Sequence, residues 1–136
     1  MNKKKIKYFN LAKQKANLSD FDRIHIGCIA VNNNKILSTG FNSKKTHPLQ
    51  AHYDQFRDPE NNSNYDHSLH AEMSCLIPLW NKNINWKKVD LYIYRIRKDI
   101  GLGLAYPCKS CITAIKDLGI KNVYYTTNNG FAHLKL

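Results

Sequence analysis

The sequence predicts an α/β fold in which a mixed sheet lies between two helical layers, a three-layer α/β/α sandwich. Three observations support this prediction. Residues 24–31 carry apolar side chains on both faces, which is typical of a strand covered on both sides. Strand-like and helix-like segments alternate along most of the 136 residues. An Asn-Asn-Gly turn at 128–130 indicates that the chain ends in an antiparallel hairpin.

The elements are expected in the order α-β-β-α-β-α-β-β, which gives a sheet of five strands. Residues 43–67 are polar and contain two prolines, so we expect a long loop or small insertion there. Long loops in compact domains are often functional. Helices are predicted over 3–17, 68–79 and 108–118, and strands over 24–31, 36–41, 89–96, 121–127 and 131–136.

Length and composition fit a single domain that spans residues 1–136. Hydrophobic residues make up 43% of the chain, which is enough for a core. No apolar run approaches the roughly 20 residues that cross a membrane, and no apolar signal core follows the basic N-terminus. We therefore expect a soluble protein in the cytoplasm, with no membrane partner. In that compartment the four cysteines are better explained as metal ligands and buried thiols than as disulfides.

The formal net charge of +11 and the pI near 9.6 have two interpretations. A basic surface favours a polyanionic partner or a substrate that carries phosphate. Alternatively, the lysines cover solvated faces without any function, because the chain is generally rich in Lys, Asn and Ile. Both interpretations stay open at the level of the sequence.

One pair of motifs carries most of the chemical information. His70-Ala71-Glu72 is followed downstream by Pro107-Cys108-Lys109-Ser110-Cys111. His and Cys are good zinc ligands, and three protein ligands leave the fourth tetrahedral position open for water, as in catalytic zinc sites. Both motifs stand at the start of a predicted helix, where the positive end of the helix dipole helps to keep thiols ionised.

Glu72 is too close to His70 in the sequence to be an idle neighbour. We expect Glu72 to take a proton from the attacking water and to deliver it to a ring nitrogen and then to a leaving amine. The pattern His-x-Glu followed by Pro-Cys-x-x-Cys is the signature of zinc deaminases. In these enzymes water adds to the carbon that bears the exocyclic amine, and ammonia leaves.

Two alternatives explain the same residues without catalysis. In the first, Cys28 or Cys75 is a fourth ligand that closes a structural zinc site. In the second, Cys108 and Cys111 form a redox pair, which leaves the His-x-Glu motif unexplained. Cys28 and Cys75 are better explained as buried thiols that act as small hydrophobic residues.

Through these motifs the chain resembles the cytidine deaminase superfamily and, within it, the deoxycytidylate-deaminase-like group. The resemblance covers about residues 24–125. It implies a cytidine-deaminase-like fold with a five-stranded mixed sheet. It also implies that His70, Cys108 and Cys111 bind zinc and that Glu72 is the proton shuttle.

The resemblance further implies contacts with the substrate. The family places an Asn in a Gly-x-Asn context, at the end of the second strand, against the substrate sugar, and Gly40-Phe41-Asn42 fits that context. An equally good interpretation of Asn42 is a turn residue that ends the strand. The backbone of Ala71 commonly borders the base in this family.

Two features bear on the branch of the superfamily. Free-nucleoside cytidine deaminases usually have Cys in place of the motif His, so His70 points toward the nucleotide, tRNA or polynucleotide branches. Deoxycytidylate and tRNA deaminases generally have a helix before a parallel fifth strand. Residues 126–136 are too few to hold such a helix and predict a hairpin instead.

Several other side chains are candidates for ligand contacts. Arg95, Arg97 and Lys98 follow the third predicted strand near the expected mouth of the site, where they could hold a phosphate or simply be solvated. Tyr106 precedes the Pro-Cys motif, where it could stack on a base or pack against the rim. Three histidines of the insertion could hold a second metal ion or lie in solvent: His47, His52 and His67.

We therefore expect a zinc-dependent hydrolytic deaminase that converts cytosine to uracil in a nucleotide such as deoxycytidylate, with cytosine preferred by resemblance only. One alternative is a cytidine deaminase that acts on single-stranded DNA or RNA, which the charge and the aromatic residues of 43–67 favour. Another is a non-catalytic, zinc-stabilised module that binds nucleic acid, against which Glu72 argues. Family members often oligomerise, so we expect a homodimer or larger assembly.

Overall fold

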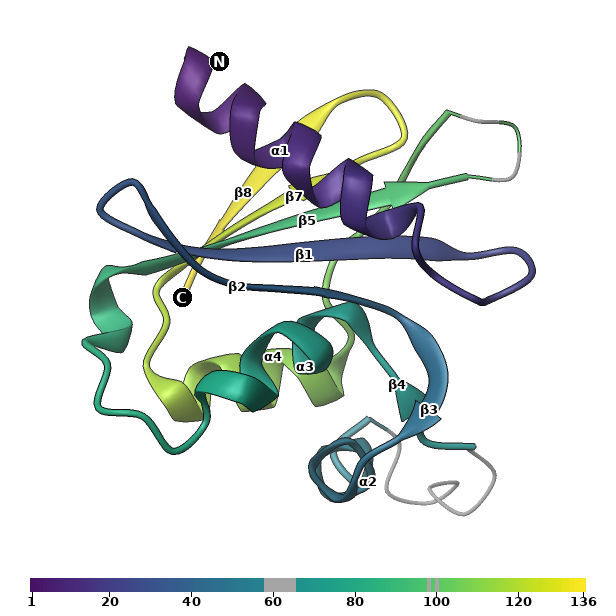
Figure 1. Cartoon of the computed structure of the whole chain (residues 1–136), viewed down its shortest axis with the longest axis vertical. Helices are drawn as coiled ribbons and strands as arrows, with labels where there is room; N and C mark the ends of the chain where they lie inside the picture. Colours follow the sequence, from purple (N-terminus) through teal and green to yellow (C-terminus); the bar gives the residue numbers. More distant parts are fainter. Residues whose placement is uncertain (58–65, 98, 100) are drawn as a thin grey trace.

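Six strands build the main sheet of the computed structural model, which describes residues 1–57, 66–97, 99 and 101–136 (Figure 1). These strands are β1 (His25–Asn32), β2 (Lys35–Phe41), β5 (Val89–Ile96), β6 (Leu102–Gly103), β7 (Asn122–Thr126) and β8 (Phe131–Lys135). Five of them lie in the order β2-β1-β5-β7-β8, and the short β6 pairs with β5. β5 and β7 run parallel, and the other described pairs of this sheet are antiparallel.

Helices cover both faces of this sheet, as the sequence predicts. The helices are α1 (Lys3–Ala16), α2 (Pro48–Asp54), α3 (Ala71–Leu76) and α4 (Lys109–Leu118), with short 3-10 helices η2 (Ile77–Leu79) and η3 (Trp86–Lys88). α1 lies on one face of the sheet, and α3 and α4 lie on the other (Figure 1). The predicted three-layer sandwich is therefore confirmed. None of the described helices is long and apolar enough to span a membrane.

Strand β1 is buried from both sides, which explains its apolar sequence. Cys28 and Ala30 belong to the core under α3 and α4, whereas Ile29 and Val31 belong to the core under α1. Alternate side chains of a strand point to opposite faces, so both sets of this strand must be apolar. The site described below lies at one end of this doubly covered strand.

Helix α1 has a side-chain cap at its N-terminus, and its buried side packs closely against β1. The side-chain oxygen of Asn2 accepts a hydrogen bond from the Lys5 backbone N–H at 2.9 Å, which satisfies one donor of the first turn. A Cβ atom added to Gly27 of β1 would overlap the Ala12 carbonyl oxygen and lie 2.6 Å from the Ala16 nitrogen. Only glycine therefore allows this approach. The buried side of the helix comprises Tyr8, Phe9, Ala12 and Ala16.

Both predicted turns are present. Asn33 and Asn34 have φ angles of 47° and 68° between β1 and β2, and two consecutive left-handed residues are typical of tight hairpin turns. At the other end of the chain, β7 and β8 form the predicted antiparallel hairpin, in which Thr126 pairs with Phe131. The chain thus ends in a hairpin rather than in a helix followed by a parallel strand.

Residues 43–67 were predicted to form a long loop or a small insertion, and the described part is not a loop throughout. β3 (Ser43–Thr46) pairs with β4 (Ser68–Leu69) in a second, two-stranded sheet, and α2 follows β3. Residues 58–65 of the predicted insertion lie outside the described residues. The segment therefore contributes a helix close to the functional site.

Helix α2 is hard to detect in the sequence because its buried positions are largely polar. Its buried residues are Gln50, Tyr53 and Asp54, so no apolar period of 3.6 marks it. The helix begins at a proline, which is favourable at a first helical position, and the imidazole of His47 accepts a hydrogen bond from the Leu49 N–H at 3.1 Å. Contacts with the rest of the fold, rather than local pattern, stabilise it.

The two helices that carry the motifs are both present, with one difference in length. α4 runs as predicted and ends at Gly119, which has a φ of 98°. α3 begins only after His70, which is its N-cap, and gives way to a 3-10 turn at 77–79. Pro78 causes this change because it has no N–H to donate to an α-helical hydrogen bond.

Replacing Gly27 with Ala should destabilise the protein, because the added methyl group must displace backbone atoms of α1. Overpacking of this kind typically costs about 1–3 kcal/mol in the free energy of unfolding, which urea denaturation measures. Gly130→Ala is the matched control, since a Cβ atom at Gly130 meets no heavy atom within 4 Å. Equal stability of the two variants would contradict the close approach of α1 to β1.

Candidate metal centre and active site

A cavity of about 430 Å³ opens at the end of the sheet where β1 begins and β5 ends. Its walls come from the segment before β1 and the start of β1, the end of β2, Arg57 after α2, residues 66–69, the start of α3, the end of β5 and the loop before α4. A hollow of this size, with both apolar and polar walls, suits a small organic ligand. The motif residues in its lining are His70, Ala71, Glu72 and Cys108.

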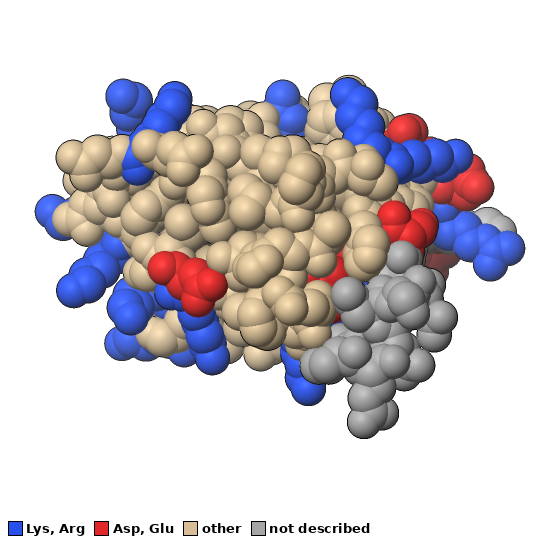
Figure 2. All heavy atoms as spheres, turned by 90° about the horizontal axis from the view of Figure 1, so that it is seen from below, with Lys and Arg blue, Asp and Glu red and all other residues tan. Residues whose placement is uncertain are grey.

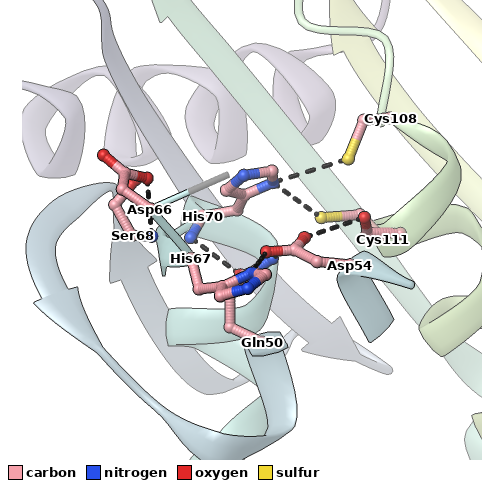
Figure 3. A network of polar contacts seen from close by, with 9 residues as sticks. Gln50, Asp54, Asp66, His67, Ser68, His70, Cys108 and Cys111 are labelled. Carbon is pink, nitrogen blue, oxygen red and sulfur yellow. Dashed lines mark hydrogen bonds and ion pairs between the residues drawn. The ribbon is translucent and has the colours of Figure 1, made fainter. Parts of the chain in front are cut away.

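Two of these lining residues, His70 and Cys108, form a compact donor cluster with the buried Cys111. The Nδ1 atom of His70 lies 3.5 Å from the Cys108 sulfur and 3.4 Å from the Cys111 sulfur (Figure 3). The ligand atoms of all three residues lie within 4.8 Å of one another. His70 and Cys108 are the N-caps of α3 and α4, so two helix N-termini converge here as the sequence predicts.

The geometry of this cluster fits zinc. In a tetrahedral site with the usual zinc–nitrogen and zinc–sulfur bond lengths, N and S ligand atoms lie roughly 3.5 Å apart. The two distances from His70 to the cysteine sulfurs match that value. One nitrogen and two sulfur donors also form the ligand set that zinc favours, and they leave one coordination position for a further ligand.

The two thiols differ in their affinity for a proton. The hydrogen bond from Cys111, opposed by burial and assisted by His70, lowers the pKa of Cys108 to about 3. The Cys108 sulfur and burial raise the pKa of Cys111 well above its ordinary value. Cys108 therefore ionises more readily than Cys111, and Cys111 would have to release its proton for both sulfurs to bind a metal ion.

Glu72 lies in the first turn of α3 and lines the cavity beside the donor cluster. Its side chain is buried, and burial raises the pKa of its carboxyl group above the ordinary value although the nearby His70 opposes the shift. A carboxyl group with a raised pKa can both accept and donate a proton near neutral pH. The position and environment of Glu72 thus suit a proton carrier.

Asn42 also lines the cavity, and its side chain is held by the start of β1. Its Oδ1 accepts a hydrogen bond from the Ile26 N–H at 3.0 Å, and its Nδ2 donates to the Ile24 carbonyl at 2.8 Å. Asn42 therefore joins the end of one strand to the start of another, as expected of a strand-ending residue. Its place in the lining is also compatible with contact to a substrate sugar.

Of the other predicted contact residues, Ala71 and Tyr106 line the cavity and Arg97 does not. Tyr106 is 47% exposed at the rim and packs edge-on against Tyr125, with ring centroids 5.3 Å apart. Arg97 follows the last residue of β5, and its Nε lies 3.2 Å from an oxygen of Asp99. Tyr106 therefore packs against a neighbouring ring, as one of the two interpretations expected, and it is also exposed enough to contact a ligand, as the other expected.

Arg95, which was predicted near the mouth of the site together with Arg97 and Lys98, does line the cavity. The side chains of Arg95 and Arg97 point to the same side of the strand, but Arg97 lies two residues, about 6.6 Å, further along. Arg95 is held by a hydrogen bond from its Nη1 to the Leu104 carbonyl at 3.3 Å. Lys98, the third basic residue named with them, lies outside the described residues.

Several lining residues were not among the predicted contacts, and two of them are Phe21 and Arg57. Phe21 comes from the connection between α1 and β1, and Arg57 follows α2. No motif or periodicity marks a residue in a connection, so the sequence holds no signal for Phe21. Arg57 lies in the segment predicted as an insertion, where its basic and aromatic neighbours were a weak indication of ligand contact.

The structure bears on two further alternatives, namely that Cys28 or Cys75 is a fourth zinc ligand and that the insertion histidines hold a second metal ion. Cys28 and Cys75 are fully buried, and neither belongs to the donor cluster found among the described residues. Within that same part of the chain no second group of metal-binding side chains is found. The insertion histidines have other partners: His47 caps α2, His52 lies 3.4 Å from Gln55, and His67 lies 2.7 Å from Asp54.

The sequence of the chain was compared with models of known protein families. The chain matches the family described as "Cytidine and deoxycytidylate deaminase zinc-binding region" over residues 2–127. The chain belongs to this family. It is therefore a deaminase whose cofactor is zinc, with His70, Cys108 and Cys111 positioned to hold the metal. The hypothesis of a non-catalytic zinc module is set aside accordingly.

Solved structures of deaminases have the same fold, and no curated protein matches the chain significantly. The dCMP deaminase from cyanophage S-TIM5 in apo form is 24% identical, with a TM-score of 0.61 over 92% of this chain and 84% of that chain. Its complex with dCMP and dUMP gives 23% identity and a TM-score of 0.62 over 92% and 82% of the two chains. The cytidine deaminase from Burkholderia pseudomallei is 15% identical, with a TM-score of 0.65 over 99% and 93%. The predicted cytidine-deaminase-like fold is thus confirmed.

Replacing Cys111 with Ala should remove the bound zinc, because it deletes one of three protein ligands. Loss of a supporting residue alone typically weakens metal binding about 10–100-fold, so loss of a ligand should cost at least that. Metal analysis after dialysis against a chelator measures zinc per chain. Cys28→Ala, which changes an equally buried cysteine outside the cluster, is the control and should keep its zinc. A Cys111→Ala protein with its full zinc content would refute the ligand assignment.

Proposed function

We propose that residues 1–136 form one deaminase domain that converts cytosine to uracil in a cytosine nucleotide. The observation that carries the proposal is a single cavity whose wall includes two residues of the donor cluster, His70 and Cys108, together with the buried Glu72. A metal site and a proton carrier that face one ligand-sized space are the two parts that hydrolytic deamination requires.

The proposed reaction uses Glu72 as the proton carrier in both directions. His70, Cys108 and Cys111 would hold the zinc, which when bound would act as a Lewis acid and lower the pKa of the attacking water toward neutrality. A carboxylate oxygen of Glu72 takes a proton from this water as its oxygen bonds to C4 of the cytosine ring, and it delivers a proton to N3. Glu72 then moves the remaining proton from the new C4 hydroxyl group to the exocyclic nitrogen. The bond from C4 to that nitrogen breaks, ammonia leaves, and the C4 oxygen becomes the uracil carbonyl.

Other residues of the cavity hold the substrate in this proposal. The backbone at Ala71 borders the base, since Ala71 lies between the metal ligand and the proton carrier. Asn42 contacts the sugar from a position that its hydrogen bonds to β1 keep constant. Tyr106 packs against the substrate at the rim.

A nucleotide is favoured over a nucleoside because two arginines line the cavity. Arg95 and Arg57 are both part of its wall, and guanidinium groups bind phosphate through paired N–H donors. The dCMP deaminase that shares this fold has been solved with dCMP and dUMP. We therefore propose deoxycytidylate or a similar cytosine nucleotide as the substrate, with Arg95 rather than Arg97 at its phosphate.

Cytosine in single-stranded DNA or RNA is the second candidate substrate. The net charge of +11 and the exposed ring of Tyr106 at the cavity rim favour it. On the face shown in Figure 2, however, Lys and Arg side chains stand mainly around the outline rather than along one track. A mononucleotide therefore remains the leading candidate.

We further propose that the enzyme works in the cytoplasm and as a homo-oligomer. Two of its three zinc ligands are thiols, which a reducing compartment protects from oxidation. Assembly is common among members of the family to which the chain belongs.

Replacing Glu72 with Gln should abolish deamination while zinc stays bound, because the amide cannot carry the proton and lies outside the ligand set. General acid–base groups typically contribute 10²–10⁴-fold, so we expect a loss of kcat of about that size. Ammonia release and uracil formation measure the rate, and metal analysis measures the zinc. Asp66→Asn changes another carboxylate of the same cavity and is the matched control. Turnover by Glu72→Gln at the wild-type rate would disprove the mechanism.

Replacing Arg95 with Ala should lower kcat/KM for deoxycytidylate about 10–100-fold, the loss expected for a hydrogen bond to a charged group. Activity on deoxycytidine, which has no phosphate, should change far less. Arg97→Ala is the control, since Arg97 lies outside the cavity wall. If only a cytosine oligonucleotide were deaminated, with an affinity that falls steeply with salt, the polymer would be the substrate instead.

A further inference from the structure

A buried carboxylate lies between the two halves of the metal centre (Figure 3). Asp54, the last residue of α2, is 1% exposed. Its Oδ1 accepts hydrogen bonds from Gln50 Nε2 and from Ser110 Oγ, each at 2.9 Å, and its Oδ2 lies 2.7 Å from His67 Nδ1. Burial alone would raise the pKa of Asp54, but these three contacts hold it below its ordinary value.

The first of these contacts leads to the histidine ligand. Gln50 is completely buried, and its Oε1 accepts a hydrogen bond from the His70 backbone N–H at 3.0 Å. A carboxylate can only accept hydrogen bonds, so the amide nitrogen of Gln50 must face Asp54 and its oxygen must face His70. Asp54 therefore sets the orientation in which Gln50 can hold the backbone of the ligand.

The second contact leads to the cysteine ligands. Ser110 is completely buried and stands between Cys108 and Cys111 in the first turn of α4. Its hydroxyl group donates to the same oxygen of Asp54 that accepts from Gln50. Oδ1 of Asp54 thus links two residues: Ser110, in the turn that carries both cysteine sulfurs, and Gln50, which accepts the hydrogen bond from the His70 backbone.

Packing α2 against α4 does not by itself require the buried hydrogen bonds of Asp54 to Gln50 and Ser110. The Tyr53 hydroxyl, from the same helix, already donates to Asp117 of α4 at 2.9 Å, on a turn that carries no metal ligand. Burying the Gln50 amide and the Asp54 carboxylate costs free energy unless every polar group finds a partner. Apolar side chains would pack the two helices without that cost.

We propose that Asp54, acting through Gln50 and Ser110, is a positioning residue that holds the histidine and cysteine halves of the metal centre in register and thereby sets its affinity for zinc. The proposal rests on the zinc-dependent function proposed above. None of the three residues lines the cavity, so they act on the ligands and not on the substrate. Groups that orient metal ligands in this way commonly change metal affinity about 10–100-fold.

The test measures zinc affinity by competition with a chelator, and the visible absorption of the cobalt-substituted protein as a report of ligand geometry. Gln50→Met keeps the volume of the side chain but leaves the His70 N–H without its acceptor. We expect zinc to bind about 10–100-fold more weakly, with an altered cobalt spectrum. Ser110→Ala, which frees the cysteine turn, should weaken binding in the same direction.

Two variants serve as matched controls. Tyr53→Phe removes the hydrogen bond to Asp117 from the same pair of helices, so it should lower stability yet keep zinc affinity and the cobalt spectrum. Asp54→Asn can keep its oxygen toward Gln50 and Ser110 and turn its amide toward His67. It should therefore retain near wild-type affinity, whereas Asp54→Ala should not.

A double variant tests whether the hydrogen bonds of Gln50 and Ser110 to Asp54 act together. Once Asp54→Ala has removed the shared acceptor, adding Ser110→Ala should weaken zinc binding little more, because both changes break the same link. If Asp54→Ala does not fold, Gln50→Met and Ser110→Ala still decide the question. Wild-type zinc affinity and cobalt spectra in both of these would overturn the positioning role. A wild-type chain that binds no zinc would instead refute the metal centre on which the proposal rests.

Discussion

The close packing of α3 on the sheet is the constraint on which the rest of the site depends. A Cβ atom on Gly40 of β2 would lie 2.8 Å from the Ala71 carbonyl oxygen and would overlap the Cys75 nitrogen. The backbone of α3 therefore rests directly on the strand, and its first turn reaches the level of the cysteine turn of α4. The His70–sulfur distances that suit zinc follow from this packing, because each ligand sits at a helix end whose position the sheet determines.

Around this centre the protein buries polar groups and supplies each with a partner. Asn42 is paired with the backbone of β1, and Asp54 with three donors, so the cost of removing them from water is offset. Glu72 differs from these groups, because burial raises the pKa of its carboxyl group and so disfavours its charged form. A carboxyl group held in this way is costly for stability and useful for proton transfer, which is a common compromise at catalytic sites.

The elements that could be predicted from the sequence are those whose pattern is local. β5 has the predicted bounds, because an apolar strand between polar turns is visible in the sequence itself. α3 is shorter than predicted because Pro78 replaces its last α-helical turn by a 3-10 turn. α2 was missed because contacts with the rest of the fold stabilise it and its buried positions, Gln50 and Asp54, are polar. Of the basic residues predicted near the mouth of the site, Arg95 lines the cavity and Arg97 does not, because a shift of two residues along a strand decides which side chain reaches the cavity.

From the sequence alone we could predict the three residues that are positioned to hold the metal, the candidate proton carrier Glu72 and the order of most helices and strands. Spacing within a motif reflects chemistry, and hydrophobic periodicity reflects which faces are covered, so both can be read without coordinates. Which distant residues lie around these ligands became visible only in the folded chain: Phe21 and Arg95 line the cavity, and Asp54 is linked by hydrogen bonds to both the histidine side and the cysteine side. Such contacts join segments tens of residues apart, and they depend on how the helices and the sheet pack rather than on any local pattern.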